Sequence, residues 1–374
     1  MNRFDRGNCN CSLRRQRAWD SIWSLPRESL QFHPGRFFPP GTREGGVKIS
    51  LQELTDLSKR ALAKYGYPEE EAAIILDMLM YAQMRGNDQG IVKLIGKGIP
   101  RHQDAQAPTV EKETPTTAII DANLSMQAIA MEQAVDMVIR KAKEMGIAIV
   151  GVHRGDGSSG AIGYWSRKIA DEGLVGITMS SHPLGMIPPH GSYEPLFCTN
   201  PIAWGVPTEN EPIVLDMSSS GISFFGLLEA KIKGVQVAEW LGYDKDGDDT
   251  TDPAEIMAGA IRPFDKGVKG AGLALMVQII GGTLVGGDFL NASDNDGNVV
   301  IAIDPEAMIG MQRFIEETTK MTTAIKKAKK LEGVEEVMVP GERGDRIRSR
   351  VLDRNEIEVE DNLLNSLKSF VEGN

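Results

Sequence analysis

The segment 147–216 constrains the fold more than any other part of the chain, because it alternates short apolar runs with glycine-rich and proline-rich loops. The β-branched run 147–152 predicts a buried strand. A helix is expected over 161–172 with Gly173 as its stop, and 174–179 is the next strand. The loop between the first strand and the helix holds Gly155, Gly157 and Gly160. This succession predicts an α/β protein whose loops contact a nucleotide-type ligand.

The three glycines match the G-x-G-x-x-G spacing of a Rossmann dinucleotide-binding loop. In that fold, backbone N–H groups approach a pyrophosphate, and the N-terminus of the following helix favours the anion. The fold also needs an Asp or Glu at the end of the second strand to bind the ribose. Here that position reads Ser180-Ser181-His182, without an acid. The sequence therefore favours a ligand-lining loop of another fold, with a true Rossmann loop and a plain structural turn as alternatives.

Composition narrows the class of protein. The chain has 374 residues, of which 41% are hydrophobic and 25% charged, as in a globular protein with room for two domains. Its net charge of -11 argues against nucleic acid or an anionic membrane as the main partner. No apolar run approaches the ~20 residues of a membrane span. Three cysteines make no disulfide framework, and no cluster has metal-ligand spacing. We expect a cytoplasmic protein without a metal.

Residues 1–46 differ from the rest of the chain. They contain eight Arg, no Lys and four acidic residues. The segment is rich in Pro, Gly and Trp and lacks hydrophobic periodicity, and its acidic residues do not suit an Arg-rich targeting peptide. We interpret it as a disordered extension or as the result of a start codon placed too early.

Regular structure follows this extension. Ser50 with Glu53 three residues later forms a capping box and predicts the start of a helix. Further along, the pattern predicts an apolar, Gly-rich and Ala-rich helix over 266–284 and a long helix over 305–331. A strand is expected over 336–339, followed by a terminal helix.

Eight motifs in order resemble the malate/L-lactate dehydrogenase-like family, which includes L-sulfolactate dehydrogenase, ureidoglycolate dehydrogenase and delta-1-piperideine-2-carboxylate reductase. The resemblance extends over about 47–371. The motifs are MRGNDQGIVKL (84–94), SSGAIGYW (158–165), PHGSYEPLFCTNPIAWGVP (189–207), IVLDMSS (213–219), TTDP (250–253), KGVKGAGLALMV (266–277), AIDPE (302–306) and VPGERGD (339–345). Each is weak alone, but the eight in order are specific.

The resemblance implies a non-Rossmann α/β fold of the malate/L-sulfolactate dehydrogenase type. It implies a central NAD(P)-binding domain over 118–284, a second domain built from 47–117 and 285–374, and a homodimer with active sites near the subunit interface. By matched motif, the residues that look like cofactor contacts are Ser180, Ser181, Asp216, Met217, Ser218, Lys269, Gly341, Glu342 and Arg343. His190 is interpreted either as a contact to a cofactor phosphate or as a loop-packing residue.

Relatives usually present two histidines as proton carriers, and both are missing here. Gln89 stands where the first is expected, and Ser158 occupies the second position. Glutamine does not titrate, and a serine hydroxyl relays a proton only if another group supplies it. Lys93 is a candidate supplier if it is buried, and an ordinary surface lysine otherwise; Asp88 is a further candidate. Recognition of a substrate carboxylate is assigned to Lys93 or to Arg85.

The sequence therefore predicts an NAD- or NADP-dependent oxidoreductase that acts on a small 2-hydroxy or 2-oxo acid, or on a cyclic imino acid. Two alternatives stay open. A Rossmann-fold dehydrogenase would have a parallel sheet whose first crossover starts at Gly155. A catalytically weak or silent homologue would bind NAD(P)H without reducing an acid, as the two absent histidines suggest.

Overall fold

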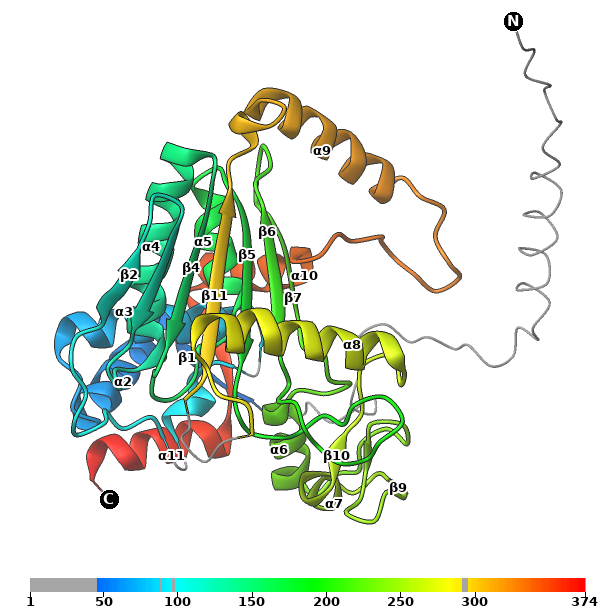
Figure 1. The fold of residues 1–374 in the computed structure, drawn as a ribbon. Helices are drawn as coiled ribbons and strands as arrows, with labels where there is room; N and C mark the ends of the chain where they lie inside the picture. The colour runs from blue at the N-terminus through cyan, green and yellow to red at the C-terminus, as the bar shows by residue number, and fades with distance from the viewer. Residues whose placement is uncertain (1–45, 88, 96–97, 291–294, 374) are drawn as a thin grey trace, which may run out of the picture. The chain divides into compact units, whose positions relative to one another are not determined.

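The computed structural model describes residues 46–87, 89–95, 98–290 and 295–373. The predictions for the N-terminal extension and for Asp88 thus fall outside the described residues. Within them, a mixed sheet of seven strands forms the centre (Figure 1). In spatial order the strands are β2 (Thr109–Glu113), β3 (Thr117–Asp121), β4 (Ile147–His153), β11 (Gly297–Ile303), β5 (Val175–Ser181), β6 (Ile202–Val206) and β7 (Ile213–Met217).

The pairing of these strands excludes the Rossmann alternative. Strands β4 and β5, which the glycine loop and its helix connect, are separated by β11, and β11 runs antiparallel to both. Strand β6 is antiparallel to β5 and to β7, and only β3 pairs with β4 in parallel among the described strands. The parallel sheet expected of that alternative is therefore not formed by the described strands, since a strand from much later in the chain lies between β4 and β5.

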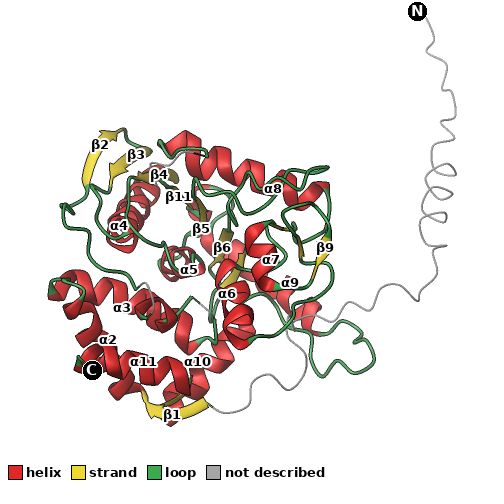
Figure 2. Ribbon diagram, turned by 90° about the horizontal axis from the view of Figure 1, so that it is seen from below, coloured by secondary structure: helices red, strands yellow, loops and turns green. Residues whose placement is uncertain are grey.

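Helices cover both faces of the sheet (Figure 2). On one face, α4 (Gln127–Met145) and α5 (Gly163–Asp171) pack against alternate apolar side chains of the strands. Val150, Val152 and Val300 point into this layer and are fully buried. The predicted helix over 161–172 and strands over 147–152 and 174–179 are confirmed, because their apolar spacing is local.

The opposite face is covered by α8 (Val268–Val277), which continues as a π-helical turn, η3 (Gln278–Gly282), and a 3-10 turn, η4 (Thr283–Val285). The predicted helix over 266–284 is thus confirmed, and its second half departs from α-helical geometry. Gly282 lies so close to β5 that an added Cβ would be 2.3 Å from Ser181 Oγ. By length and composition, Val268–Val285 is apolar enough to span a membrane, but it is 44% buried, as expected of a core helix that lies along a sheet.

The two ends of the described chain lie side by side. Strand β1 (Gly46–Ser50) pairs with β12 (Glu356–Glu360). Ser50 Oγ accepts a hydrogen bond of 3.0 Å from Glu53 N, so the predicted capping box starts a helix. The helices around this pair are α2 (Leu51–Lys64), α3 (Glu69–Met84), α10 (Glu342–Arg354) and α11 (Asp361–Glu372), with the 3-10 turn η2 (Ile91–Leu94) beside them.

This arrangement bears on the predicted domain boundaries. The N- and C-terminal segments pack together, but β2 and β11, assigned from the sequence to the terminal domain, belong to the central sheet. Residues 118 and 285 are therefore not boundaries of that sheet. The division into a cofactor domain and a terminal domain stays a prediction.

Two smaller groups of helices and short strands lie beyond opposite ends of the strands of the central sheet (Figure 1). Beyond the end of β7 are α6 (Phe224–Lys233), α7 (Pro253–Ala258) and the short strands β8 (Gly242–Tyr243), β9 (Asp249–Thr250) and β10 (Ala260–Ile261). Beyond β11, the turn η5 (Pro305–Ala307) precedes α9 (Met311–Lys326). The predicted long helix is interrupted because Gly310 adopts φ +83°. The predicted strand at 336–339 is wrong, because this segment is irregular.

Candidate functional site

Three loops meet at one edge of the sheet, namely the edge formed by strand ends and not by an outer strand. Because β5 and β7 both run antiparallel to β6, and β4 and β5 both run antiparallel to β11, the carboxyl ends of β4, β5 and β7 share this edge. The glycine loop follows β4 there. The edge therefore collects the residues that the sequence assigned to cofactor binding and catalysis after each of these strands.

Lys93 and Ser158, two of the three predicted catalytic residues, are in contact. Lys93 Nζ donates a hydrogen bond of 3.0 Å to Ser158 Oγ, although the residues belong to η2 and the glycine loop. Lys93 is only 4% exposed. Its ammonium also lies 3.9 Å from the centre of the Phe225 ring in α6. Lys93 is therefore not the surface lysine that the sequence left as an alternative.

Gln89, the third predicted catalytic residue, is half-buried in the turn before η2. Its backbone N–H donates a hydrogen bond of 2.9 Å to Asn87 Oδ1. Gly90 follows at a close approach, since an added Cβ would lie 2.4 Å from Gln83 Oε1. This packing fixes the turn and directs the next residues into η2. Gln89 thus precedes the Lys93–Ser158 contact along the chain.

Four of the predicted cofactor residues gather at the carboxyl ends of β5 and β7. Ser180 Oγ is 3.2 Å from Ser159 Oγ of the glycine loop. Ser181 is 2% exposed, and its hydroxyl has no hydrogen-bond partner among the described residues. Met217 ends β7, and Ser218 Oγ donates a hydrogen bond of 3.0 Å to the carbonyl of Thr199. The structure therefore forms a hydroxyl-rich edge next to the Lys93–Ser158 contact.

Asp216 stabilises the N-terminus of α5. Its Oδ2 accepts a hydrogen bond of 2.9 Å from Gly163 N, the first residue of that helix. A carboxylate at this place interacts favourably with the positive end of the helix dipole. A Rossmann loop would offer the same helix terminus to a pyrophosphate. Because Asp216 already supplies a negative charge here, a cofactor phosphate needs positive groups elsewhere.

The remaining predicted cofactor residues lie on other elements. Gly341, Glu342 and Arg343 form the start of α10, where Gly341 packs against the backbone of Val214 near the beginning of β7. Lys269 in α8 and His190 in the loop before β6 are exposed. The structure thus brings together the residues that follow β5 and β7 but not the whole predicted set.

The side chain of Arg85 binds the start of α10. Its guanidinium is 8% exposed, forms an ion pair with Asp345 and donates a hydrogen bond of 3.1 Å to the carbonyl of Gly341. Asp345 also accepts from Arg167 of α5 at 2.8 Å. These contacts tie α3, α5 and α10 together. Of the two predicted carboxylate-binding residues, Lys93 is therefore the one adjacent to Ser158.

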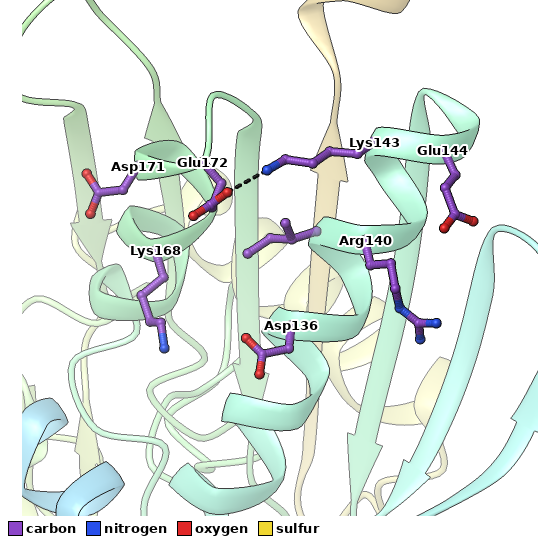
Figure 3. Close-up of a pocket in the computed structure, with 8 residues that line it drawn as sticks. Asp136, Arg140, Lys143, Glu144, Lys168, Asp171 and Glu172 are labelled. Carbon is purple, nitrogen blue, oxygen red and sulfur yellow. Dashed lines mark hydrogen bonds and ion pairs between the residues drawn. The ribbon is translucent and has the colours of Figure 1, made fainter.

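A charged groove between α4 and α5 lies at the opposite edge, beside the amino ends of β4 and β5 (Figure 3). Lys143 and Glu172 face each other across it at 2.5 Å. The side chains that line it are Asp136, Ile139, Arg140, Lys143, Glu144, Lys168, Asp171 and Glu172. Three cations and four anions line the groove, so it has no net attraction for an anionic cofactor.

Two residues of this region were missed by the sequence analysis. Phe225 gives no motif, and its contact with Lys93 depends on how α6 packs. Asp296 stands in a polar Asn-Asp-Gly-Asn run that is typical of an exposed turn, yet it is 5% exposed at the start of β11. Burial, followed by the nearby charge of Asp156, raises the pKa of Asp296 to about 8. No local signal distinguishes such a residue from a turn aspartate.

Comparisons with known proteins agree with this fold. A family model described as malate/L-lactate dehydrogenase matches residues 49–368. An L-sulfolactate dehydrogenase of Methanocaldococcus jannaschii is 32% identical over 328 residues, 83% of this chain and 92% of that protein. An Escherichia coli O157:H7 protein named ureidoglycolate dehydrogenase (NAD(+)) is 29% identical over 342 residues, 86% of this chain and 95% of that protein. The structure of malate dehydrogenase from Pyrococcus horikoshii matches with a TM-score of 0.78 and 27% identity, over 91% of this chain and 98% of that chain.

The mixed sheet and these similarities define a non-Rossmann dehydrogenase or reductase. The chain belongs to the malate/L-lactate dehydrogenase family, and the family prediction is confirmed. This family contains NAD(P)-dependent dehydrogenases of 2-hydroxy acids and reductases of imino acids.

Proposed function

We propose that this chain is an NAD(P)-dependent oxidoreductase of a small 2-hydroxy or 2-oxo acid, or of a cyclic imino acid, with Lys93 and Ser158 in place of the missing histidines. The observation that carries the proposal is the 3.0 Å hydrogen bond from the buried Lys93 ammonium to Ser158 Oγ. A serine hydroxyl needs a supplier to act as a proton relay, and Lys93 is in position to be that supplier.

The proton step follows from this geometry. In the reducing direction, Ser158 gives its hydroxyl proton to the oxygen or nitrogen on which negative charge develops. Lys93 then gives a proton to Ser158 Oγ. Afterwards a proton from solvent returns to Lys93 through the Ser158 hydroxyl. Before the reaction, the charge of Lys93 attracts the substrate carboxylate, and the attraction is strong because little water screens a buried ammonium.

The cofactor is held by the chain's hydroxyl-rich edge and by exposed cations. When bound, NAD(P)H supplies the hydride. Ser180 and Ser218 provide hydroxyls at this edge that suit polar groups of the cofactor, whereas the hydroxyl of Ser181 is buried against Gly282. Because Asp216 occupies the N-terminus of α5, we assign the phosphates to the exposed Lys269 of α8 rather than to Arg343, which lies near the beginning of β7. These roles, with those of His190, Met217, Gly341 and Glu342, stay proposals that cofactor titration of variants can test.

The decisive experiment measures cofactor binding and turnover on the same full-length protein. NADH and NADPH are titrated by fluorescence, and 2-oxo acids and cyclic imines are then added. We expect Lys93→Met to lower kcat by roughly 10²- to 10⁴-fold without weakening cofactor binding, because a general acid contributes that much. Ser158→Ala should have a similar effect, and the double variant should lose no more than the worse single one. Lys143→Met, in the groove of Figure 3, is the matched control.

A second candidate is a catalytically silent homologue that binds NAD(P)H. The presence of Gln89 and Ser158 at the two histidine positions favours it. It predicts saturable binding of a cofactor and no oxidation with any acid of the panel. Failure to bind either cofactor would contradict both candidates.

We further propose that the chain is a homodimer, supported by an apolar strip on the outer side of α8, η3 and η4. The exposed side chains of this strip are Val268, Leu275, Met276, Ile279 and Leu284, of which Leu284 is 64% exposed. Contiguous exposed apolar surface is typical of a protein interface. Light scattering coupled to size exclusion should give a dimer mass, and Met276→Asp with Leu284→Asp should reduce it to that of a monomer. An unchanged mass in the double variant would exclude this strip as the interface.

A further inference from the structure

Phe225 covers one side of the predicted substrate-binding ammonium. Its ring centre is 3.9 Å from Lys93 Nζ, and the ring of Phe224 packs edge-on against it at 5.7 Å and 81°. Ser223 Oγ accepts a hydrogen bond of 2.9 Å from Gly226 N, which fixes the start of α6 and hence the direction of both rings. Both phenylalanines are half-buried.

We propose that Phe225 is a specificity-determining residue that selects monocarboxylic 2-oxo or imino acids with an apolar or planar body over dicarboxylic or sulfonated acids. This inference rests on the proposed function, since it assigns the substrate carboxylate to Lys93. A carboxylate held by that ammonium shares it with the face of Phe225. The rest of the substrate therefore lies against the phenyl rings of α6.

The apolar surface of the phenyl rings of α6 discriminates between these two classes of acid. A ring or an alkyl side chain gains apolar contact with Phe225, whereas a second carboxylate or a sulfonate would lose water there without gaining a partner from the ring. The other cation predicted for carboxylate binding, Arg85, is held by Asp345 and the carbonyl of Gly341. A hydrophobic pocket of this kind typically separates substrates by about 10- to 200-fold in kcat/KM.

The test compares kcat/KM for phenylpyruvate and 1-piperideine-2-carboxylate with kcat/KM for oxaloacetate and sulfopyruvate, with the preferred cofactor. We expect the first pair to exceed the second by on the order of tenfold or more. Phe225→Arg should reverse the preference, because it places a second cation beside Lys93. Phe225→Leu keeps an apolar wall without a π face; it should weaken the preference for planar acids but still reject oxaloacetate. Phe314→Arg, in α9 at the opposite edge of the sheet, is the matched control (Figure 1).

The outcomes separate this inference from the function on which it rests. Equal or better turnover of oxaloacetate in the wild type, with loss of activity in Lys93→Met, would overturn the inference and leave the proposed function intact. If no acid is turned over, calorimetric titration of phenylpyruvate and oxaloacetate into the protein with NAD⁺ or NADP⁺ decides. Tighter binding of phenylpyruvate that is lost in Phe225→Arg would support the specificity wall in a silent homologue, and the absence of any preference would refute it.

Discussion

Replacing Asp296 with asparagine removes a carboxyl group that folding withdraws from water. The side chain is 5% exposed, and burial is the main cause that raises its pKa from an ordinary value of 3.8 to about 8. At pH 7 the carboxyl is therefore protonated in the folded protein and ionised in the unfolded chain. Folding takes up one proton, and the free energy of this uptake depends on pH.

The sign and size of the effect follow directly. Because the folded pKa is above the unfolded one, the folded state binds more protons between these two values, and the free energy of unfolding falls as the pH rises. The fall is about 1.4 kcal/mol for each pH unit. An asparagine side chain does not titrate. The free energy of unfolding of Asp296→Asn, relative to that of the wild type, should therefore rise by about 4 kcal/mol between pH 5 and pH 8. Above the folded pKa the difference should become constant.

Urea unfolding followed by circular dichroism at several pH values between 5 and 9 measures this difference, provided that the m-values of the two proteins agree. Asp246→Asn is the matched control, because the Asp246 side chain is 66% exposed in a surface turn. Parallel stability curves for Asp296→Asn and the wild type across this range would refute the reasoning. They would mean that Asp296 does not take up a proton when the chain folds.

Three further predictions concern the helices α2 and α10, and each is measured by urea unfolding. Ser50→Ala removes the cap of α2 and should cost about 1 kcal/mol, whereas Ser50→Asp should preserve most of the stability. Asp345→Ala leaves the buried Arg85 without its carboxylate and should cost about 3–5 kcal/mol; a cost below about 1 kcal/mol would mean that the pair does not hold α10. Gly341→Ala should cost about 1–3 kcal/mol, because Gly341 adopts φ +95° and an added Cβ would lie 3.1 Å from the backbone of Val214. A neutral substitution would show that the turn adjusts freely.

Local patterns predicted the elements of the central sheet better than their arrangement. The apolar runs that became β4 and β5 and the amphipathic helix between them depend on neighbours in sequence, so their limits were close. The insertion of β11 between β4 and β5 depends on pairing with a distant segment, for which the sequence pattern carries no register. The same limitation explains why β2 and β11 were not assigned to the central sheet. The change from α-helical to π-helical geometry after α8 likewise occurs where Gly282 closely approaches Ser181, a contact between distant segments.

The site divides in the same way. Family motifs led to Lys93 and Ser158 separately, but only tertiary packing brings η2 to the glycine loop. Phe225 could not be selected, because a phenylalanine in a helix is ordinarily a core residue and its contact with Lys93 is not local. Asp296 could not be selected either, because the turn-like residues around it hide its burial at the start of β11.

The glycine loop after β4 differs in its contacts from the loop of a Rossmann protein. In a Rossmann protein such a loop leaves the helix N-terminus open to a phosphate, but here Asp216 occupies that terminus. Gly157 and Gly160 adopt φ +78° and +75°, conformations that other residues rarely adopt. These two bends bracket a pair of serines that diverge, since Ser158 contacts Lys93 and Ser159 contacts Ser180. The two glycines therefore let Ser158 face Lys93 while Ser159 faces Ser180, which accounts for a fingerprint spacing in a fold without Rossmann topology.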